Sequence, residues 1–208
     1  MEQLPAARRY SATAKALHWS IAALILIDFA LAISFSQFNP GDALYLPMAY
    51  SMHMSFGMSV LMLSVPFVIR RLAFGYPRHT DDTGAPSRVL ARIVHELLYA
   101  FMVVVPVTGW VILSVRKRPA RLLGSVDWPN VPILAGLPRE PRVLLHDWFL
   151  PTHRMLAYLG MILVGLHFVA ALYHHFYRRD DVLKRMLPQI PRRVPHLWRR
   201  SNDGVDSN

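Results

Sequence analysis

Residues Met155–Tyr177 read MLAYLGMILVGLHFVAALYHHFY, a run of 23 residues that contains no Asp, Glu, Lys or Arg. A helix of about 20 mostly apolar residues spans a bilayer, so this run is long enough to be a transmembrane helix. Ala43–Ile69 and Leu97–Val115 also lack these charged residues, and Ala16–Gly41 contains only Asp28. Because backbone polar groups cannot stay unpaired in lipid, helix is the conformation we expect. The predicted fold class is an all-α membrane protein, a four-transmembrane-helix bundle with helices at about 16–37, 46–70, 93–115 and 152–177.

The composition of the chain agrees with this fold class and excludes several others. Only 17% of the 208 residues are charged, below the roughly 25% of soluble domains. The apolar share of 53% excludes a disordered polymer. The chain has no cysteine, which excludes a disulfide framework, cysteine-ligated metal and covalent c-type haem. The net charge of +10 is separated from the apolar runs, whereas a nucleic-acid binder would mix the two.

Lysine and arginine in the connections predict the orientation of the bundle. Sixteen lie in the N-terminal arm, the connection after the second span and the C-terminal tail, and the first connection has none. By the positive-inside rule both termini are cytoplasmic, which gives a transmembrane domain at 1–188 and a basic cytoplasmic tail at 189–208. The third connection departs from the rule with six cations, which are Arg116, Lys117, Arg118, Arg121, Arg139 and Arg142.

Four histidines fall in the spans at two predicted depths. His18 opens the first span near the cytoplasmic face, while His53 and His153 open the second and fourth spans near the outer face. His167 follows His153 by fourteen residues, a rise of about 21 Å that keeps both rings within about 40° of one helix face. His167 therefore returns to the depth of His18. We expect two pairs, His18 with His167 and His53 with His153.

Facing histidines on two helices can hold one haem iron between two imidazoles. Gly160, midway between His153 and His167, would leave room for the porphyrin edges to approach each other. The structural alternative is that small residues and interhelical histidine bonds are common in membrane bundles. A zinc site or a histidine-lined metal transporter would gather three or four ligands at one centre. Because the depths separate the histidines two and two, we favour two haems.

Several segments carry a family resemblance when they are taken in chain order. They are Ala16-Leu17-His18-Trp19, His53–Gly57, Arg70-Arg71, His95-Glu96-Leu97-Leu98-Tyr99 with Pro106 and Gly109, and His153–His175 continuing into Met186-Leu187-Pro188. In this order and spacing they resemble the bacterial cytochrome b561 family of four-helix dihaem inner-membrane proteins. The resemblance covers roughly residues 10–188.

The resemblance implies two non-covalent haem b groups with His18, His53, His153 and His167 as axial ligands. It also implies a bacterial inner-membrane location and electron exchange with membrane quinone, with ubiquinone as the electron partner. Some family members are described as superoxide:ubiquinone oxidoreductases, and others look like electron-transfer subunits of separate enzymes. We therefore expect electron transfer between a periplasmic-side donor, superoxide or a protein, and the quinone pool.

Other polar residues are candidates for contacts with haem propionates or quinone. Arg70, Arg71 and Arg154 could neutralise propionates, although Arg70 and Arg71 could instead only set the topology. His95 could bond a propionate or quinone, or make a capping or interhelical hydrogen bond. Asp28 lies about 15 Å into the first span, where a carboxyl group is costly. It is either a proton relay between quinone and water or part of an interhelical hydrogen bond.

The third connection, Arg116–Arg142, is predicted to form an ordered lid because it contains Trp128 and several prolines, among them Pro129, Pro132, Pro138 and Pro141. Its excess of cations would raise the local concentration of small anions such as superoxide, or attract an acidic electron-transfer protein. Binding of lipid headgroups is the alternative role for these cations.

Overall fold

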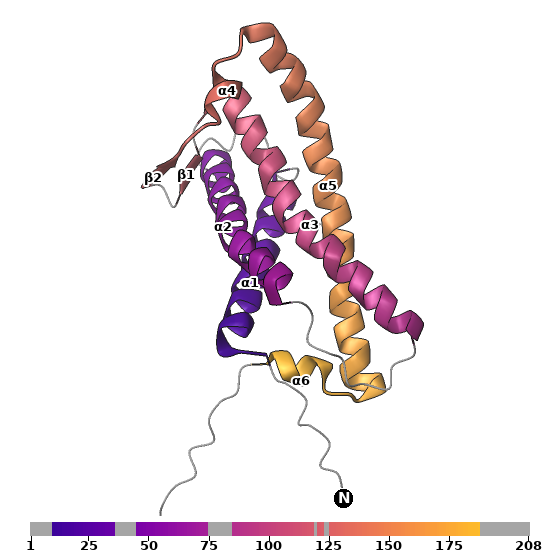
Figure 1. Ribbon diagram of the computed structural model, residues 1–208. Helices are drawn as coiled ribbons and strands as arrows, with labels where there is room; N and C mark the ends of the chain where they lie inside the picture. The colour runs from indigo at the N-terminus through magenta and orange to yellow at the C-terminus, as the bar shows by residue number, and fades with distance from the viewer. Residues whose placement is uncertain (1–9, 36–44, 75–84, 119, 123–124, 188–208) are drawn as a thin grey trace, which may run out of the picture.

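The computed structural model describes residues 10–35, 45–74, 85–118, 120–122 and 125–187. Figure 1 shows the elements that these residues form. In chain order they are α1 (Ala12–Ser34), α2 (Tyr45–Phe74), α3 (Ala85–Val115), β1 (Ala120–Leu122), β2 (Val126–Trp128), α4 (Pro132–Ala135), α5 (Arg139–Tyr173), the π-helical turn η1 (His174–Arg178) and α6 (Val182–Met186). The tail predicted at 189–208 lies outside the described residues.

Four helices in the described part of the chain, α1, α2, α3 and α5, are long and apolar enough to cross a membrane. They overlap the four predicted spans, and the predicted fold class is therefore confirmed. Only 6% to 28% of the residues in the most apolar window of each span are buried within the protein. Large side chains such as Leu26, Ile162 and Phe168 are about 60% exposed. Such apolar outer faces suit contact with lipid rather than with water.

Two of the helices begin well before their predicted starts. The predicted start of the third helix was 93, but α3 begins at Ala85. The predicted start of the fourth was 152, but α5 begins at Arg139, after the N-cap Pro138 and with Glu140 in its first turn. Charged residues prevent a segment from spanning lipid but do not prevent it from being helical. His153 therefore lies fourteen residues inside α5 instead of opening it.

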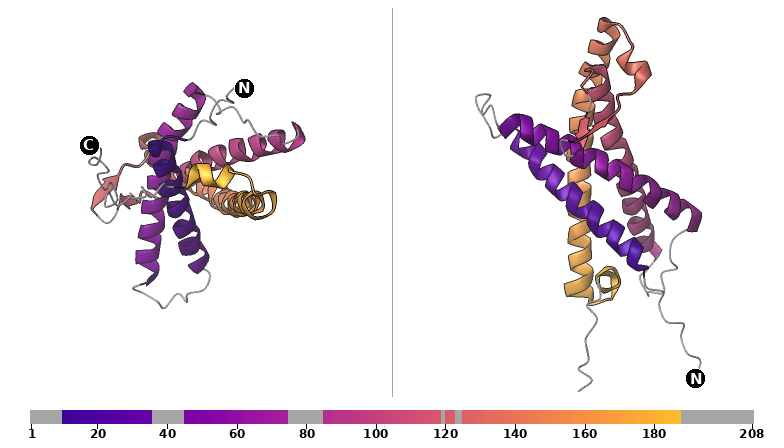
Figure 2. Two further views of the ribbon diagram at one scale, coloured as in Figure 1. Left: turned by 90° about the horizontal axis from the view of Figure 1, so that it is seen from below. Right: turned by 90° about the vertical axis from the view of Figure 1, so that its left-hand side faces the viewer.

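The helices pack in the order α1 on α2, α2 on α3 and α3 on α5. Figures 1 and 2 show α3 and α5 side by side, with α1 and α2 crossing them at an angle. Met58 and Leu61 of α2 are buried against Val103, Trp110 and Leu113 of α3, which forms the apolar core. Neither α1 nor α2 packs along α5 to a comparable extent. The helices that carry the predicted histidine pairs are thus not in close backbone contact.

One end of the bundle, which we call the hairpin end, is covered by β1, β2 and α4 (Figure 1). The two strands are antiparallel, with Arg121 opposite Asp127. The Ser55 hydroxyl of α2 donates to the Arg121 carbonyl at 2.8 Å, and Trp110 Nε1 of α3 donates to the Pro129 carbonyl at 2.8 Å. The described residues of the third connection therefore form a cover bound to α2 and α3.

The opposite end, which we call the α6 end, is closed by α6 against the start of α1. Trp19 Nε1 donates to the Met186 carbonyl at 2.8 Å, and Lys15 Nζ donates to the Leu187 carbonyl at 3.2 Å. These bonds join residues that are far apart in the sequence and bring the end of the described chain beneath the first helix.

The chain leaves η1 through Arg179, which has a left-handed backbone with φ of 51°. His174 Nδ1 contacts Asp180 Oδ2 at 2.5 Å across this turn. Partial burial alone would raise the pKa of Asp180, but the His174 and Val182 hydrogen bonds and the neighbouring positive charges lower it overall. His174 therefore has a role in ending the helix.

At the hairpin end, α3 stops at a Schellman motif with Lys117 in the left-handed conformation (φ of 53°). The Arg118 N–H donates to the Leu113 carbonyl at 3.1 Å, which closes the last turn. The side chain of Arg118 points outward and is exposed.

Arg142 of α5, which follows the third connection in the chain, also binds the C-terminal end of α3. Its Nη1 donates to the Val115 carbonyl at 2.9 Å, and its Nε donates to the Leu137 carbonyl at 3.1 Å. A guanidinium at a helix C-terminus also interacts favourably with the helix dipole. Arg142 therefore holds α3 and α5 together and is not a free surface cation.

We expect Arg142→Ala to destabilise the protein by about 1.5–3 kcal/mol, the usual value of hydrogen bonds from a charged donor. The measurement is the thermal unfolding midpoint of the purified protein in detergent. Arg118→Ala is the control. It removes an exposed arginine from the turn that ends α3, and no side-chain bond is broken. Equal melting temperatures for the two variants would contradict the role given to Arg142.

Candidate functional site

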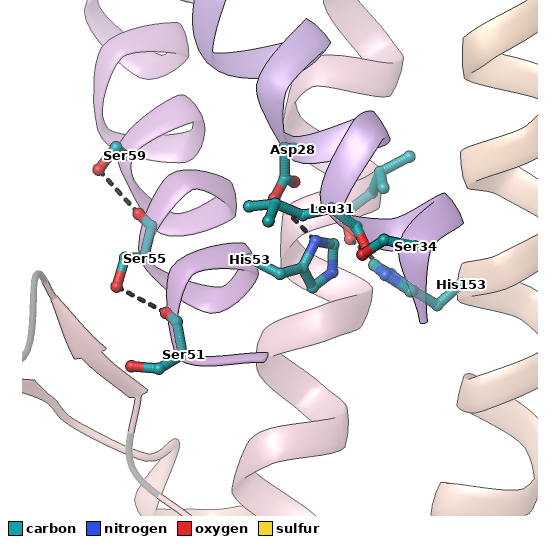
Figure 3. A network of polar contacts seen from close by, with 9 residues as sticks. Asp28, Leu31, Ser34, Ser51, His53, Ser55, Ser59 and His153 are labelled. Atoms are coloured by element: carbon teal, nitrogen blue, oxygen red, sulfur yellow. Dashed lines mark hydrogen bonds and ion pairs between the residues drawn. The ribbon is translucent and has the colours of Figure 1, made fainter. Parts of the chain in front are cut away.

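The structure brings His53 of α2 and His153 of α5 together near the hairpin end. Their ring centres are 6.2 Å apart and their planes are inclined by 75°. Figure 3 shows the two rings approaching each other from separate helices. We call these residues the hairpin-side pair.

A second pair lies toward the α6 end and is formed by His18 of α1 and His167 of α5. Their ring centres are 6.4 Å apart and their planes are inclined by 65°. One helix, α5, thus contributes a histidine to each pair, and its partners come from two other helices. We call these residues the α6-side pair.

The spacing within both pairs fits two imidazoles bound to one metal atom. Two metal–nitrogen bonds of about 2 Å, as imidazole makes to metals, and about 1 Å from each nitrogen to its ring centre place the centres about 6 Å apart. The observed 6.2 Å and 6.4 Å agree with this sum. Because α5 is not packed closely on α1 or α2, a flat cofactor can lie between these helices. The residues present therefore fit a haem held by two histidines at each position.

The His153 ring is oriented by two residues of α3. Its Nδ1 lies 3.2 Å from the Val105 carbonyl oxygen and 3.0 Å from Thr108 Oγ1, and the Thr108 hydroxyl donates to the same carbonyl at 2.7 Å. A proton on Nδ1 satisfies these acceptors and leaves the Nε2 lone pair for a metal. Sequence reasoning missed Thr108, although a polar residue within a span is itself a signal.

Gly109 makes space for the same imidazole. A Cβ atom at this position would lie 3.3 Å from His153 Cε1, closer than side chains normally approach. Gly160 has a different neighbour from the one expected. A Cβ atom there would lie 3.1 Å from Phe101 Cδ1, so Gly160 accommodates a phenylalanine of α3. The clearance expected for porphyrin edges beside Gly160 is therefore occupied by Phe101 in this structure.

Asp28 of α1 contacts the histidine of α2 in the hairpin-side pair. Asp28 Oδ1 lies 2.7 Å from His53 Nδ1, and the two side chains are only 15% and 23% exposed. Figure 3 shows this contact on the side of the His53 ring away from α5. Of the two hypotheses for Asp28, the structure thus shows an interhelical contact, and its partner is a histidine.

His95 lies beside the α6-side pair. Its Nδ1 is 2.6 Å from the Ala91 carbonyl, one turn back on α3, and its ring centre is 5.2 Å from that of His167. This bond lies within α3, so it is neither the capping bond nor the interhelical bond considered for this residue. Its contact with His167 still places it next to the proposed cofactor position.

The three arginines considered as propionate contacts differ in their surroundings. Arg71 Nη2 binds Glu96 Oε1 at 3.0 Å, and Arg70 Nη2 donates to Ser11 Oγ at 3.4 Å. Both bonds join the end of α2 to neighbouring helices at the α6 end. Arg154 follows His153 on α5 and its side chain is exposed.

The four paired histidines are arranged two and two, with His95 beside the α6-side pair. Within the described residues no three His, Cys, Asp or Glu side chains gather as a metal ion would require. The zinc and metal-transporter alternatives would need three or four ligands at one centre.

Four apolar helices with imidazoles paired between them define a multi-pass membrane protein of the cytochrome b class. The sequence matches the family described as prokaryotic cytochrome b561 over residues 9–189, and the chain belongs to this family. It is therefore a transmembrane cytochrome b with a role in electron transfer, and the members of this family bind haem b.

Three curated relatives cover nearly the whole chain. Cytochrome b561 homolog 2 of Escherichia coli is 30% identical over 86% of this chain and 91% of its own length. The probable superoxide oxidase CybB of Yersinia pestis is 26% identical over 88% of this chain and 97% of its own. Cytochrome b561 homolog 1 of Escherichia coli is 26% identical over 87% of this chain and 98% of its own.

We expect Gly109→Ala to displace the His153 ring and to lower the haem content of the purified protein. The added methyl group would lie 3.3 Å from His153 Cε1, so the ring would have to shift by a few tenths of an ångström, whereas Gly165→Ala meets no atom within 4 Å and serves as the control. The measurement is haem per chain with the reduced-minus-oxidised spectrum. Unchanged haem content and spectrum in Gly109→Ala would show that the glycine is not needed for ring placement.

Proposed function

We propose that the protein transfers electrons between a periplasmic donor and the membrane quinone pool through two haem b groups. His18 and His167 would hold one haem, and His53 and His153 would hold the other. The observation that carries this proposal is the pair of imidazole–imidazole distances, 6.4 Å and 6.2 Å, at two levels along α5. Bound haem b supplies one-electron redox chemistry between ferric and ferrous iron.

In this arrangement two imidazoles from different helices would hold each haem. Electron exchange would then take place at the haem edge rather than by substrate binding at the metal. The protein residues would therefore hold the cofactors, set their environment and exclude water from the interior of the bundle.

We place both termini in the cytoplasm and the hairpin end in the periplasm, on the basis of the lysine and arginine distribution. The membrane is then the bacterial inner membrane. In this orientation the hairpin-side pair faces the donor, and quinone and ubiquinol exchange with the surrounding lipid.

Superoxide is our proposed donor, with ubiquinone as the acceptor. One relative is named a probable superoxide oxidase, which supports this choice. Two superoxide anions would give two electrons and become O₂, and ubiquinone would take up these electrons with two protons to form ubiquinol. The donor loses only an electron, which suits outer-sphere transfer.

The exposed cations at the hairpin end support an anionic donor. Arg116, Lys117 and Arg118 form an exposed segment that we call the basic turn. Arg121 is paired with Asp127 at 3.1 Å, and Arg142 is bonded to backbone carbonyls. Positive potential concentrated in the basic turn would raise the encounter rate of small anions. An acidic redox protein would be attracted by the same charges, and an electron-transfer subunit is therefore our second candidate function.

Replacement of either histidine of one pair is expected to remove one haem while the other remains. We predict that His53→Ala and His153→Ala each lower the content from two haems per chain to one, because one imidazole alone holds the cofactor weakly. His146→Ala is the control, since His146 lies two turns from His153 on α5 and belongs to neither pair. A full haem content in both ligand variants, or a colourless zinc-binding wild type, would refute the proposed ligands.

The donor can be tested with the purified protein and a soluble ubiquinone analogue. We expect superoxide-dependent quinone reduction that falls about tenfold at low salt when Arg116, Lys117 and Arg118 are all changed to Gln. High salt should reduce the difference by screening the charges. The control combines Arg121→Gln with Asp127→Asn, which leaves the net charge unchanged. No quinone reduction by the wild type would favour the subunit function.

A further inference from the structure

The hairpin-side pair contains a carboxylate contact that the α6-side pair lacks. Among the described residues, His53 is the only one of the four paired histidines whose ring contacts an acidic side chain. The Nδ1 atom of His153 in the same pair faces neutral groups, the Val105 carbonyl and the Thr108 hydroxyl. The two cofactor positions therefore differ in charge.

We propose that Asp28 is a positioning residue for His53 that holds its Nε2 toward the iron and lowers the reduction potential of the hairpin-side haem. This inference rests on the proposed haem ligation by His53 and His153. Electron transfer by itself does not require the largely buried carboxyl group of Asp28, and the positioning of His53 gives that group a role.

The geometry of the contact favours one ring orientation. Asp28 Oδ1 approaches His53 Nδ1 at 2.7 Å as an ion-pair contact, and neither buried atom makes a hydrogen bond of ordinary geometry among the described residues. The negative charge beside Nδ1 favours a proton on that nitrogen, which leaves Nε2 unprotonated and available as a ligand. Metal-bound histidines commonly have such a carboxylate behind the ring, which fixes the tautomer and raises the basicity of the ligand.

The surroundings of the contact keep its electrostatic effect strong. The Phe35 ring lies edge-on to His53, with centres 5.5 Å apart, and stacks on Tyr50 at 4.2 Å. Both side chains of the Asp28–His53 contact are largely withdrawn from solvent. A charge in such a place is poorly screened.

The sign of the effect follows from the charge of the iron. Oxidation of a haem with two neutral axial imidazoles adds one positive charge, and a nearby carboxylate stabilises that oxidised form. Asp28 should therefore favour ferric over ferrous haem at the hairpin-side position. His18 lies ten residues earlier on α1, so one helix supplies a ligand to one haem and a negative charge to the other.

The test is a redox titration of the hairpin-side haem alone, in a His18→Ala background that removes the α6-side haem. We expect Asp28→Asn to raise the ferrous-to-ferric ratio at a fixed ambient potential about tenfold, which equals ~59 mV for one electron. Asp28→Glu keeps the charge and should stay within about threefold of the wild type. Thr108→Val is the matched neutral control beside His153 and should change the ratio less than Asp28→Asn.

The possible outcomes separate this inference from the proposed function. If the His18→Ala protein binds no haem, the proposed ligation fails before Asp28 is tested. If it binds one haem and Asp28→Asn leaves the potential unchanged, or if Asn and Glu shift it equally, the inference is wrong and the ligation stands. Should Asp28→Asn not accumulate, Asp28→Ser provides the same uncharged comparison. A further measurement uses Asp28→Asn without the His18→Ala change. Loss of only the hairpin-side haem in this variant, with recovery of that haem in Asp28→Glu, would also support the positioning role.

Discussion

The separation of His153 and His167 along α5 is the constraint on which the rest of the site depends. Fourteen helical residues place the two rings on nearly one face and about 21 Å apart. Each ring then needs a partner at its own depth, and the structure supplies one from α2 and one from α1. The bundle achieves this because α5 is braced by α3, which leaves its histidine face directed at the other two helices.

The two ends of the bundle are held by different polar contacts. At the hairpin end, the guanidinium of Arg142 satisfies carbonyls of α3 and of the connection, and Ser55 binds the hairpin. At the α6 end, Trp19 and Lys15 donate to the last carbonyls of the described chain. Each of these bonds satisfies a backbone carbonyl where the helices leave the apolar zone.

Much of the fold could be predicted because lipid imposes simple rules. Runs without charge revealed the four spans, and helical periodicity alone paired the histidines by depth. The starts of α3 and α5 could not be predicted in the same way, because the hydropathy rule marks where a helix can enter lipid and is silent on where it begins. Gly160 shows a similar limit, since its small size indicated a close approach without showing that Phe101 was the partner.

The sequence by itself determined that this chain is a basic, cysteine-free, four-span membrane protein with paired histidines, because length, charge and periodicity are local properties. Only the tertiary structure decided what stands behind each ring. Asp28 and His53 are 25 residues apart in the chain, and Thr108 and His153 are 45 apart. Their contacts depend on the crossing of α1 with α2 and on the close packing of α3 with α5. Such contacts set the environment of a ligand, and no local pattern records them.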